Sequence, residues 1–104
     1  MNNCIFCKII NKEIPGEIVF EDDKVIAFLD AYPESKGHTL LVPKQHYANI
    51  MEKEDEIDLF AYLKKVVKLL KEDYKFEDFK VVNNCGKKAG QEVFHMHIHI
   101  IPYY

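Results

Sequence analysis

The segment His95-Met96-His97-Ile98-His99-Ile100-Ile101 carries the strongest structural signal in this chain of 104 residues. Along a β-strand every second side chain points to the same face, so the three histidines are predicted to share one face, about 6–7 Å apart. Met96, Ile98 and Ile100 would point to the opposite face, toward the core. Because imidazole fills a hydrophobic core poorly, the segment predicts a strand whose histidine face carries chemistry.

The apolar patterns on either side of this segment predict the rest of the fold. Strands are expected at residues 17–21, 24–29, 38–42, 79–83 and 94–101, a short amphipathic helix at 4–11 and a long helix at roughly 53–74. Asp22 and Asp23 separate the first two strands and predict a tight hairpin. The order of elements excludes alternating β-α-β units. We therefore predict an α+β fold, a five-stranded antiparallel meander covered on one side by the long helix.

Length and charge limit the class of protein. A chain of 104 residues suits one domain, spanning residues 1–104, with a core that needs no disulfides. The net charge of −3 gives no electrostatic reason to expect a nucleic acid or an anionic membrane as partner. No apolar run approaches the length of about 20 residues that a membrane span needs. Residues 1–8 lack the basic and apolar regions of a signal peptide, so a cytoplasmic protein is expected.

Three of the five histidines form the triplet. The other two flank the strand at 38–42: His38 opens it, and His46 follows just past its end. A His-x-His-x-His strand suits either a catalytic metal or acid–base and nucleophilic chemistry at phosphorus. The loop before the triplet favours phosphorus, since the amides of Asn84 and Gln91 and the backbone N–H groups near Gly90 suit phosphate oxygens.

The three cysteines cannot form disulfides without a remainder, and disulfides are rare in a reducing compartment. Cys4 and Cys7, two residues apart on a helical turn, make half of a tetrahedral zinc site. The alternative is that both are small thiols packed in a core helix.

The triplet resembles the signature of the histidine triad superfamily, in particular its branch of histidine triad nucleotide-binding proteins. Five other segments match recurrent motifs of that branch: residues 4–10 (CIFCKII), 12–15 (KEIP), 20–23 (FEDD), 37–44 (GHTLLVPK) and 90–95 (GQEVFH). The resemblance implies hydrolysis or transfer at the α-phosphorus of purine nucleoside phosphoramidates, aminoacyl-adenylates or related nucleotides, through a nucleotidyl-histidine intermediate. Two alternatives are a dinucleoside polyphosphate hydrolase and a nucleotide-binding interaction protein with incidental turnover.

By position in the motif, the resemblance makes His97 the nucleophile. His99 would pass a proton on the leaving-group side, and His38 would hold the phosphate together with Asn84 and Gln91. A neutral imidazole is a competent nucleophile at pH 7 without a strong base.

The resemblance also implies a purine and ribose slot. The slot residues would be Phe6, Ile9, Phe28, Leu29 and Leu40, with Asp30 accepting from the ribose hydroxyls and Gly90, Gln91 and Glu92 beside the phosphate. For the apolar residues the alternative is plain core, and for Asp30 a turn or capping aspartate. Some relatives have serine at the position of Glu92, and a carboxylate there would repel anionic leaving groups and favour cationic ones. The basic residue that many relatives place after the proline is replaced in Pro102-Tyr103-Tyr104.

Relatives with the cysteine pair bind a structural zinc, and the resemblance implies Cys4, Cys7, His46 and His95 as its ligands; catalysis would need no cofactor. The resemblance also implies a homodimer joined at sheet edges. Strand 79–83 supports this prediction because Lys80 is its only edge charge. We further expect Leu59, Leu63 and Val66 to give the long helix more apolar surface than one sheet covers.

Overall fold

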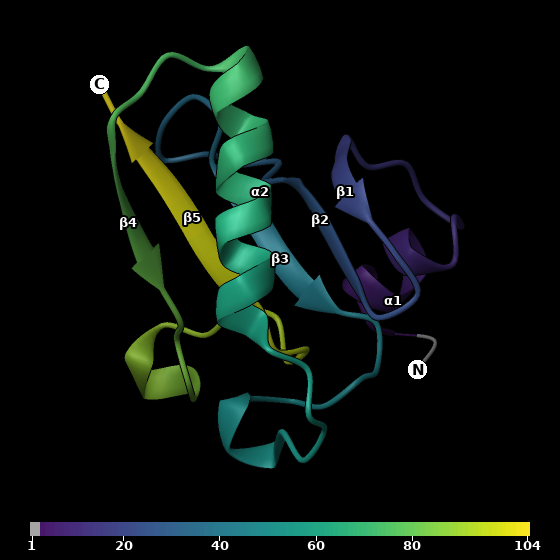
Figure 1. Ribbon diagram of the computed structural model, residues 1–104. Helices are drawn as coiled ribbons and strands as arrows, with labels where there is room; N and C mark the ends of the chain where they lie inside the picture. The colour runs from purple at the N-terminus through teal and green to yellow at the C-terminus, as the bar shows by residue number, and fades with distance from the viewer. Residues whose placement is uncertain (1–2) are drawn as a thin grey trace.

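A five-stranded antiparallel sheet lies between a long helix and a short one in the computed structural model, which describes residues 3–104 (Figure 1). The long helix α2 (Leu59–Asp73) covers one face, and the short helix α1 (Ile5–Ile10) lies against the other. Residues 1–2, part of the stretch used for the compartment prediction, lie outside the described residues. The α+β prediction, with one short and one long helix, is confirmed.

The five strands are β1 (Ile18–Glu21), β2 (Val25–Leu29), β3 (Thr39–Pro43), β4 (Asp78–Val82) and β5 (Ile98–Tyr103). Their order in the sheet is β1-β2-β3-β5-β4, with every neighbouring pair antiparallel. The predicted hairpin forms between β1 and β2, where a side-chain oxygen of Asp22 accepts from the N–H groups of Lys24 and Val25. The simple meander is wrong, because α2 carries the chain across the sheet and β5 returns between β3 and β4 (Figure 1).

Two hydrophobic clusters form because strand side chains alternate between faces. Val25, Ala27 and Leu41 pack on the α2 side, together with Met96, Ile98 and Ile100, which confirms the predicted inward face of the triplet. The intervening residues of β2 and β3 pack against Phe6 and Ile9 of α1 on the other face. The sheet is therefore buried on both faces at its centre, and α1 places two apolar side chains beside the histidines.

The predicted boundaries of the long helix and the last strand are wrong by several residues. Helix α2 begins at Leu59 rather than near residue 53, because the Asp58 side chain caps its first turn by accepting from the N–H of Ala61. A 3-10 turn (Ile50–Glu52) precedes it. Strand β5 begins at Ile98 rather than at residue 94, since the backbone N–H of Met96 bonds to the loop after β3 instead of to the sheet.

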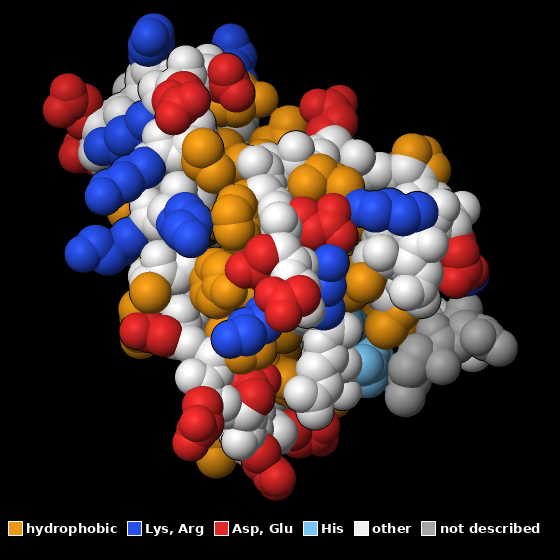
Figure 2. All heavy atoms as spheres, turned by 45° about the vertical axis from the view of Figure 1, so that its right-hand side comes forward, with side chains coloured by type: hydrophobic (Ala, Val, Ile, Leu, Met, Phe, Trp, Pro, Cys, Tyr) orange, Lys and Arg blue, Asp and Glu red, His pale blue; other side chains and the backbone are white. Residues whose placement is uncertain are grey.

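Leu59, Leu63 and Val66 are buried in the α2 cluster, so the expectation that they form excess apolar surface is wrong. Phe60 of α2 is a large exposed apolar residue, with 76% of its surface accessible. Lysines gather along the α2 side of the molecule, where Lys64, Lys65, Lys68 and Lys71 are exposed (Figure 2). Among residues 3–104 no helix is long and apolar enough to cross a membrane.

Candidate active site and metal centre

A cleft of about 840 Å³ opens beside the histidine triplet. Side chains of α1, the ends of β2 and β3, the loop after β2 and the residues before β5 line it. The lining includes the predicted site residues Phe6, Ile9, Phe28, Leu29, Asp30, His38, Leu40, Gly90, Glu92, His97 and His99. The fold thus brings together residues that are up to 93 positions apart in the sequence, from Phe6 to His99.

The His97 ring is held in one orientation by the backbone. Its Nδ1 lies 2.8 Å from the carbonyl oxygen of His95. Since a carbonyl can only accept, Nδ1 carries the hydrogen, and Nε2 of the neutral ring keeps its lone pair. Only 7% of His97 is exposed, and no described hydrogen bond of residues 3–104 uses its Nε2. The ring therefore presents a free lone pair from a nearly buried position on the cleft wall.

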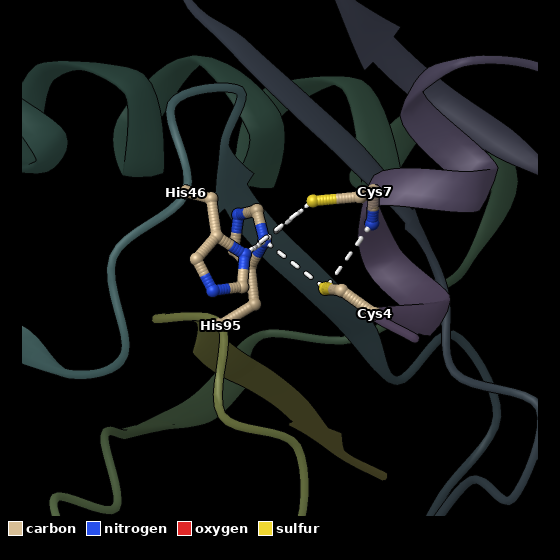
Figure 3. Close-up of side chains that lie close together, drawn as sticks. All are labelled: Cys4, Cys7, His46 and His95. Carbon is tan, nitrogen blue, oxygen red and sulfur yellow. Dashed lines mark hydrogen bonds between the residues drawn. The ribbon is translucent and has the colours of Figure 1, made fainter. Parts of the chain in front are cut away.

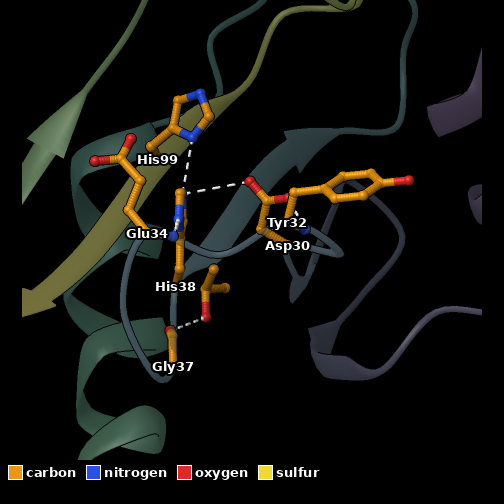
Figure 4. Close-up of polar contacts among 7 residues, drawn as sticks. Asp30, Tyr32, Glu34, Gly37, His38 and His99 are labelled. Atoms are coloured by element: carbon orange, nitrogen blue, oxygen red, sulfur yellow. Dashed lines mark hydrogen bonds and ion pairs between the residues drawn. The ribbon is translucent and has the colours of Figure 1, made fainter.

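His99 and His38 form a second, directional pair (Figure 4). The backbone N–H of Glu34 donates to Nδ1 of His38 at 3.0 Å, so the hydrogen of the neutral His38 ring is on Nε2. That Nε2 lies 2.9 Å from Nδ1 of His99 and 3.5 Å from a carboxylate oxygen of Asp30. His38 therefore donates to His99, and the hydrogen of the neutral His99 ring is on Nε2.

Burial lowers the pKa of His38, His97 and His99 below the ordinary value of 6.5. The charge of Asp30 opposes this effect at all three rings, and Glu34 opposes it at His38 and His99. At neutral pH the three imidazoles are therefore uncharged, as the three tautomer assignments require.

Phe6 is the centre of the apolar part of the cleft. Its ring packs edge-on against Phe28 at 5.4 Å and against His97 at 5.0 Å between ring centres. Phe6 and Ile9 also belong to the second hydrophobic cluster, so they are core residues that line the cleft as well. Asp30 forms the turn that was the alternative to its ribose role: one oxygen accepts from the N–H of Tyr32, and the other faces His38.

The amides of Asn84 and Gln91 serve the loop before β5 and are not among the residues lining the cleft. Gln91 is 3% exposed; its amide nitrogen donates to the carbonyls of Ala48 and Val93, and its oxygen accepts from the N–H of Gly86. Asn84 donates to the carbonyl of Ala89. Gly90 lies between them with a φ of 94°, and a Cβ there would come within 3.3 Å of the Asn84 amide. Both amides thus shape the loop that carries Gly90 and Glu92 to the cleft.

The remaining histidine of the triplet, His95, belongs to a separate cluster with Cys4, Cys7 and His46 (Figure 3). Its Nε2 donates to the carbonyl oxygen of Pro43 at 2.7 Å, which leaves the Nδ1 lone pair facing the other three side chains. Nδ1 lies 3.4 Å from Sγ of Cys4, 3.6 Å from Sγ of Cys7 and 3.0 Å from Nδ1 of His46.

These separations can be tested against a tetrahedral ion. Zinc bonds of about 2.3 Å to sulfur and about 2.0–2.1 Å to nitrogen place neighbouring ligand atoms about 3.3–3.8 Å apart. The four donor atoms all lie within 4.8 Å of one another, and the backbone N–H of Cys7 already donates to Sγ of Cys4. Burial, followed by the neighbouring Cys4, raises the pKa of Cys7 to about 11, so two thiolates here need a cation beside them. The cluster can therefore hold a metal ion.

Three residues that position the site are missed by the sequence analysis. Glu34 fixes the tautomer of His38 through its backbone N–H, and Pro43 orients His95 through its carbonyl. Both act through main-chain atoms, so residue type gave no signal for either. Asn83, which donates to the carbonyl of His97, was likewise expected only as a strand residue.

The sheet, the two helices and the histidine series define an α+β protein of the histidine-triad type. A model of the HIT domain family matches residues 11–104. An uncharacterised HIT-like protein of Methanocaldococcus jannaschii is 52% identical over 103 residues, covering 97% of this chain and 79% of that protein. The adenosine 5'-monophosphoramidase of Schizosaccharomyces pombe is 43% identical over 102 residues, covering 96% and 74%. A HIT family crystal structure from Bacillus subtilis matches with a TM-score of 0.92 and 46% identity, covering 98% and 74%. The chain belongs to the HIT domain family.

Proposed function

We propose that the protein is a nucleotide hydrolase or transferase that cleaves purine nucleoside phosphoramidates, aminoacyl-adenylates or related nucleotides at the α-phosphorus. The observation that carries the proposal is the His97 ring, whose Nδ1–H is tied to a backbone carbonyl while its Nε2 lone pair is free at the cleft. The similarity to an adenosine 5'-monophosphoramidase supports the choice of substrate class.

The proposed reaction has two steps. In the first, Nε2 of His97 attacks the phosphorus and the bond from phosphorus to the leaving nitrogen breaks. His99, which takes up a proton from solvent as the anionic substrate binds, gives a proton from Nε2 to the leaving nitrogen, so that a neutral amine departs and the His99 ring is again neutral. The His95 carbonyl stabilises the charge that develops on the His97 ring, and the hydrogen bond from His38 supports His99. In the second, water attacks the phosphorus, the bond to Nε2 breaks, and the proton from water returns to His99.

The nucleoside is proposed to lie in the apolar slot, with the base against Phe6, Ile9, Phe28, Leu29 and Leu40. Asp30 is proposed to accept from a ribose hydroxyl through the oxygen that faces His38, since its other oxygen accepts from the N–H of Tyr32. Since the amides of Asn84 and Gln91 are engaged in the loop, we propose that they act on the phosphate by holding Gly90 and Glu92 in place.

Zinc is the proposed ion of the Cys4, Cys7, His46 and His95 cluster, because two thiolates and two imidazoles are the donors that it prefers. Four protein ligands would leave no open position, so the ion would be structural. His97 and the His38–His99 pair lie outside the cluster, and the proposed reaction needs no cofactor.

A homodimer is proposed through the edge strand β4. Its residues Phe79 and Val81 are 38% and 41% exposed, and β4 has no partner on its outer side among residues 3–104. Exposed strand edges are normally paired, covered or charged, and a second copy would pair this one in a self-complementary contact.

The test of the reaction is His97→Ala, assayed with a fluorogenic adenosine phosphoramidate beside diadenosine tetraphosphate. We expect wild type to turn over the phosphoramidate, and the variant to lose turnover while still binding adenosine monophosphate. Mass spectrometry of acid-quenched wild type should detect a nucleotidyl adduct on His97. Tyr104→Phe, which removes one exposed hydroxyl after the end of β5 together with its hydrogen bond to the carbonyl of Lys36, serves as the control. Turnover by His97→Ala within tenfold of wild type would refute the assignment of the nucleophile.

A further inference from the structure

Several acidic side chains line the cleft. Glu17, Asp30, Glu34 and Glu92 all line it, and none of its lining residues among 3–104 is a lysine or arginine. This is unexpected for a site that takes an anionic nucleotide, since phosphate sites commonly use cationic side chains. The charge of the cleft therefore bears on which substrates can bind productively.

Three of these carboxylates surround the proton donor of the proposed reaction. Asp30, Glu34 and Glu92 all lie close enough to His99 for their charges to act on its pKa, against the larger effect of burial. Glu34 and Glu92 are exposed, whereas His97 is 93% buried, being 7% exposed. We call Asp30, Glu34 and Glu92 the acidic rim. It lies at the solvent side of the site, and Figure 4 shows Asp30 and Glu34 on either side of the His38–His99 pair.

The leaving group must reach this rim. It has to lie within hydrogen-bond distance of His99 to receive a proton, and the buried His97 must approach the phosphorus from the opposite side. A substituent on the leaving nitrogen therefore projects away from His97, past His99 and between the exposed carboxylates.

We propose that the acidic rim selects substrates whose leaving group is positively charged. The proposal rests on the reaction assigned to His97 and specifies the leaving group of that reaction. An amine with a second ammonium group is attracted to the rim, and a leaving group with a carboxylate is repelled. A dinucleoside polyphosphate is repelled most, because its leaving group brings several negative charges and no lysine or arginine among the described residues lines the cleft to neutralise them.

The experiment uses three adenosine 5'-phosphoramidates whose amine leaving groups have the same chain length and end in an ammonium, a hydroxyl or a carboxylate. One exposed carboxylate about 4 Å from the terminal charge changes binding about fivefold in either direction. We therefore expect kcat/KM to fall in the order ammonium, hydroxyl, carboxylate, with about a tenfold or larger ratio between the extremes. The ratio should shrink as salt is raised, since the rim is exposed.

Glu92→Gln and Glu34→Gln keep the shape of each side chain and remove its charge. Each should lower the ammonium-to-carboxylate ratio several-fold. The matched control is Glu17→Gln, which removes a carboxylate from the same cleft that does not act on His99; its ratio should stay within about twofold of wild type. If all three substrates are turned over and the ammonium-to-carboxylate ratio is equal in wild type and both rim variants, selection by the acidic rim is refuted, while the proposed reaction still stands. No turnover of any of the three substrates would overturn both.

Discussion

Removal of the proposed zinc ion is predicted to release helix α1 from the sheet. The helix has six residues and buries two apolar side chains deeply, Phe6 and Ile9, which are 5% and 8% exposed. Burial of these two stabilises the docked helix by about 3–6 kcal/mol. Ordering six backbone residues costs about 6–12 kcal/mol. A metal ion held through Cys4 and Cys7, present at a thousand times its dissociation constant, contributes about 4 kcal/mol, which is close to the difference.

The assay is hydrogen exchange of residues 5–10, followed by mass spectrometry, together with the melting temperature from circular dichroism. After chelation, or in Cys4→Ala, α1 should exchange much faster and the melting temperature should fall by about 10 °C or more. Cys85→Ala is the matched control, because Cys85 is a half-buried free cysteine outside the cluster. Complete loss of zinc, measured by elemental analysis, with unchanged exchange of α1 and unchanged melting temperature would refute the reasoning.

Two other predictions concern pH and assembly. Burial lowers the pKa of His38, so as the pH falls below 6.5 the unfolded chain binds a proton that the folded chain does not. The free energy of unfolding should therefore decrease there by at most about 1.4 kcal/mol per pH unit. Denaturant titrations of His38→Gln should show that this part of the pH dependence is lost. Val81→Lys on β4 should shift the mass measured by light scattering from twice the chain mass to 12.2 kDa. Ile18→Lys is the control, because Ile18 is equally exposed on the opposite edge strand β1, and it should leave the dimer intact. A monomeric wild type would contradict the proposed dimer.

The sequence predicts the strands and both faces of the triplet, because period-two alternation is a local property that burial enforces. Met96, Ile98 and Ile100 pack where their spacing places them. The start of α2 could not be placed from apolar spacing, since residues 53–58 carry an acceptable helical pattern but Asp55 and Asp58 bond to nearby backbone N–H groups instead. A signal was present, because an aspartate just before Leu59 is a typical N-cap.

The order of strands could not be predicted from the same local patterns. Both a meander and the observed order satisfy the alternation of every strand, and the choice depends on where the 15-residue helix α2 returns the chain. The roles of Asn84 and Gln91 are a similar case. Each amide can bond equally well to a phosphate or to a carbonyl, and only the path of the loop decides which partner lies within reach.

The three histidines are equally spaced in the sequence, but the backbone gives each ring a different role. Each ring is fixed by a different partner: His95 by the carbonyl of Pro43, His97 by the carbonyl of His95, and His99 by the ring of His38. His95 therefore acts twice, because its side chain faces the cysteines while its carbonyl sets the tautomer of His97. Any movement of His95 toward or away from a metal ion also moves the carbonyl that holds the nucleophile. The proposed metal site and the proposed reaction share no side chain, yet they are joined through this one residue.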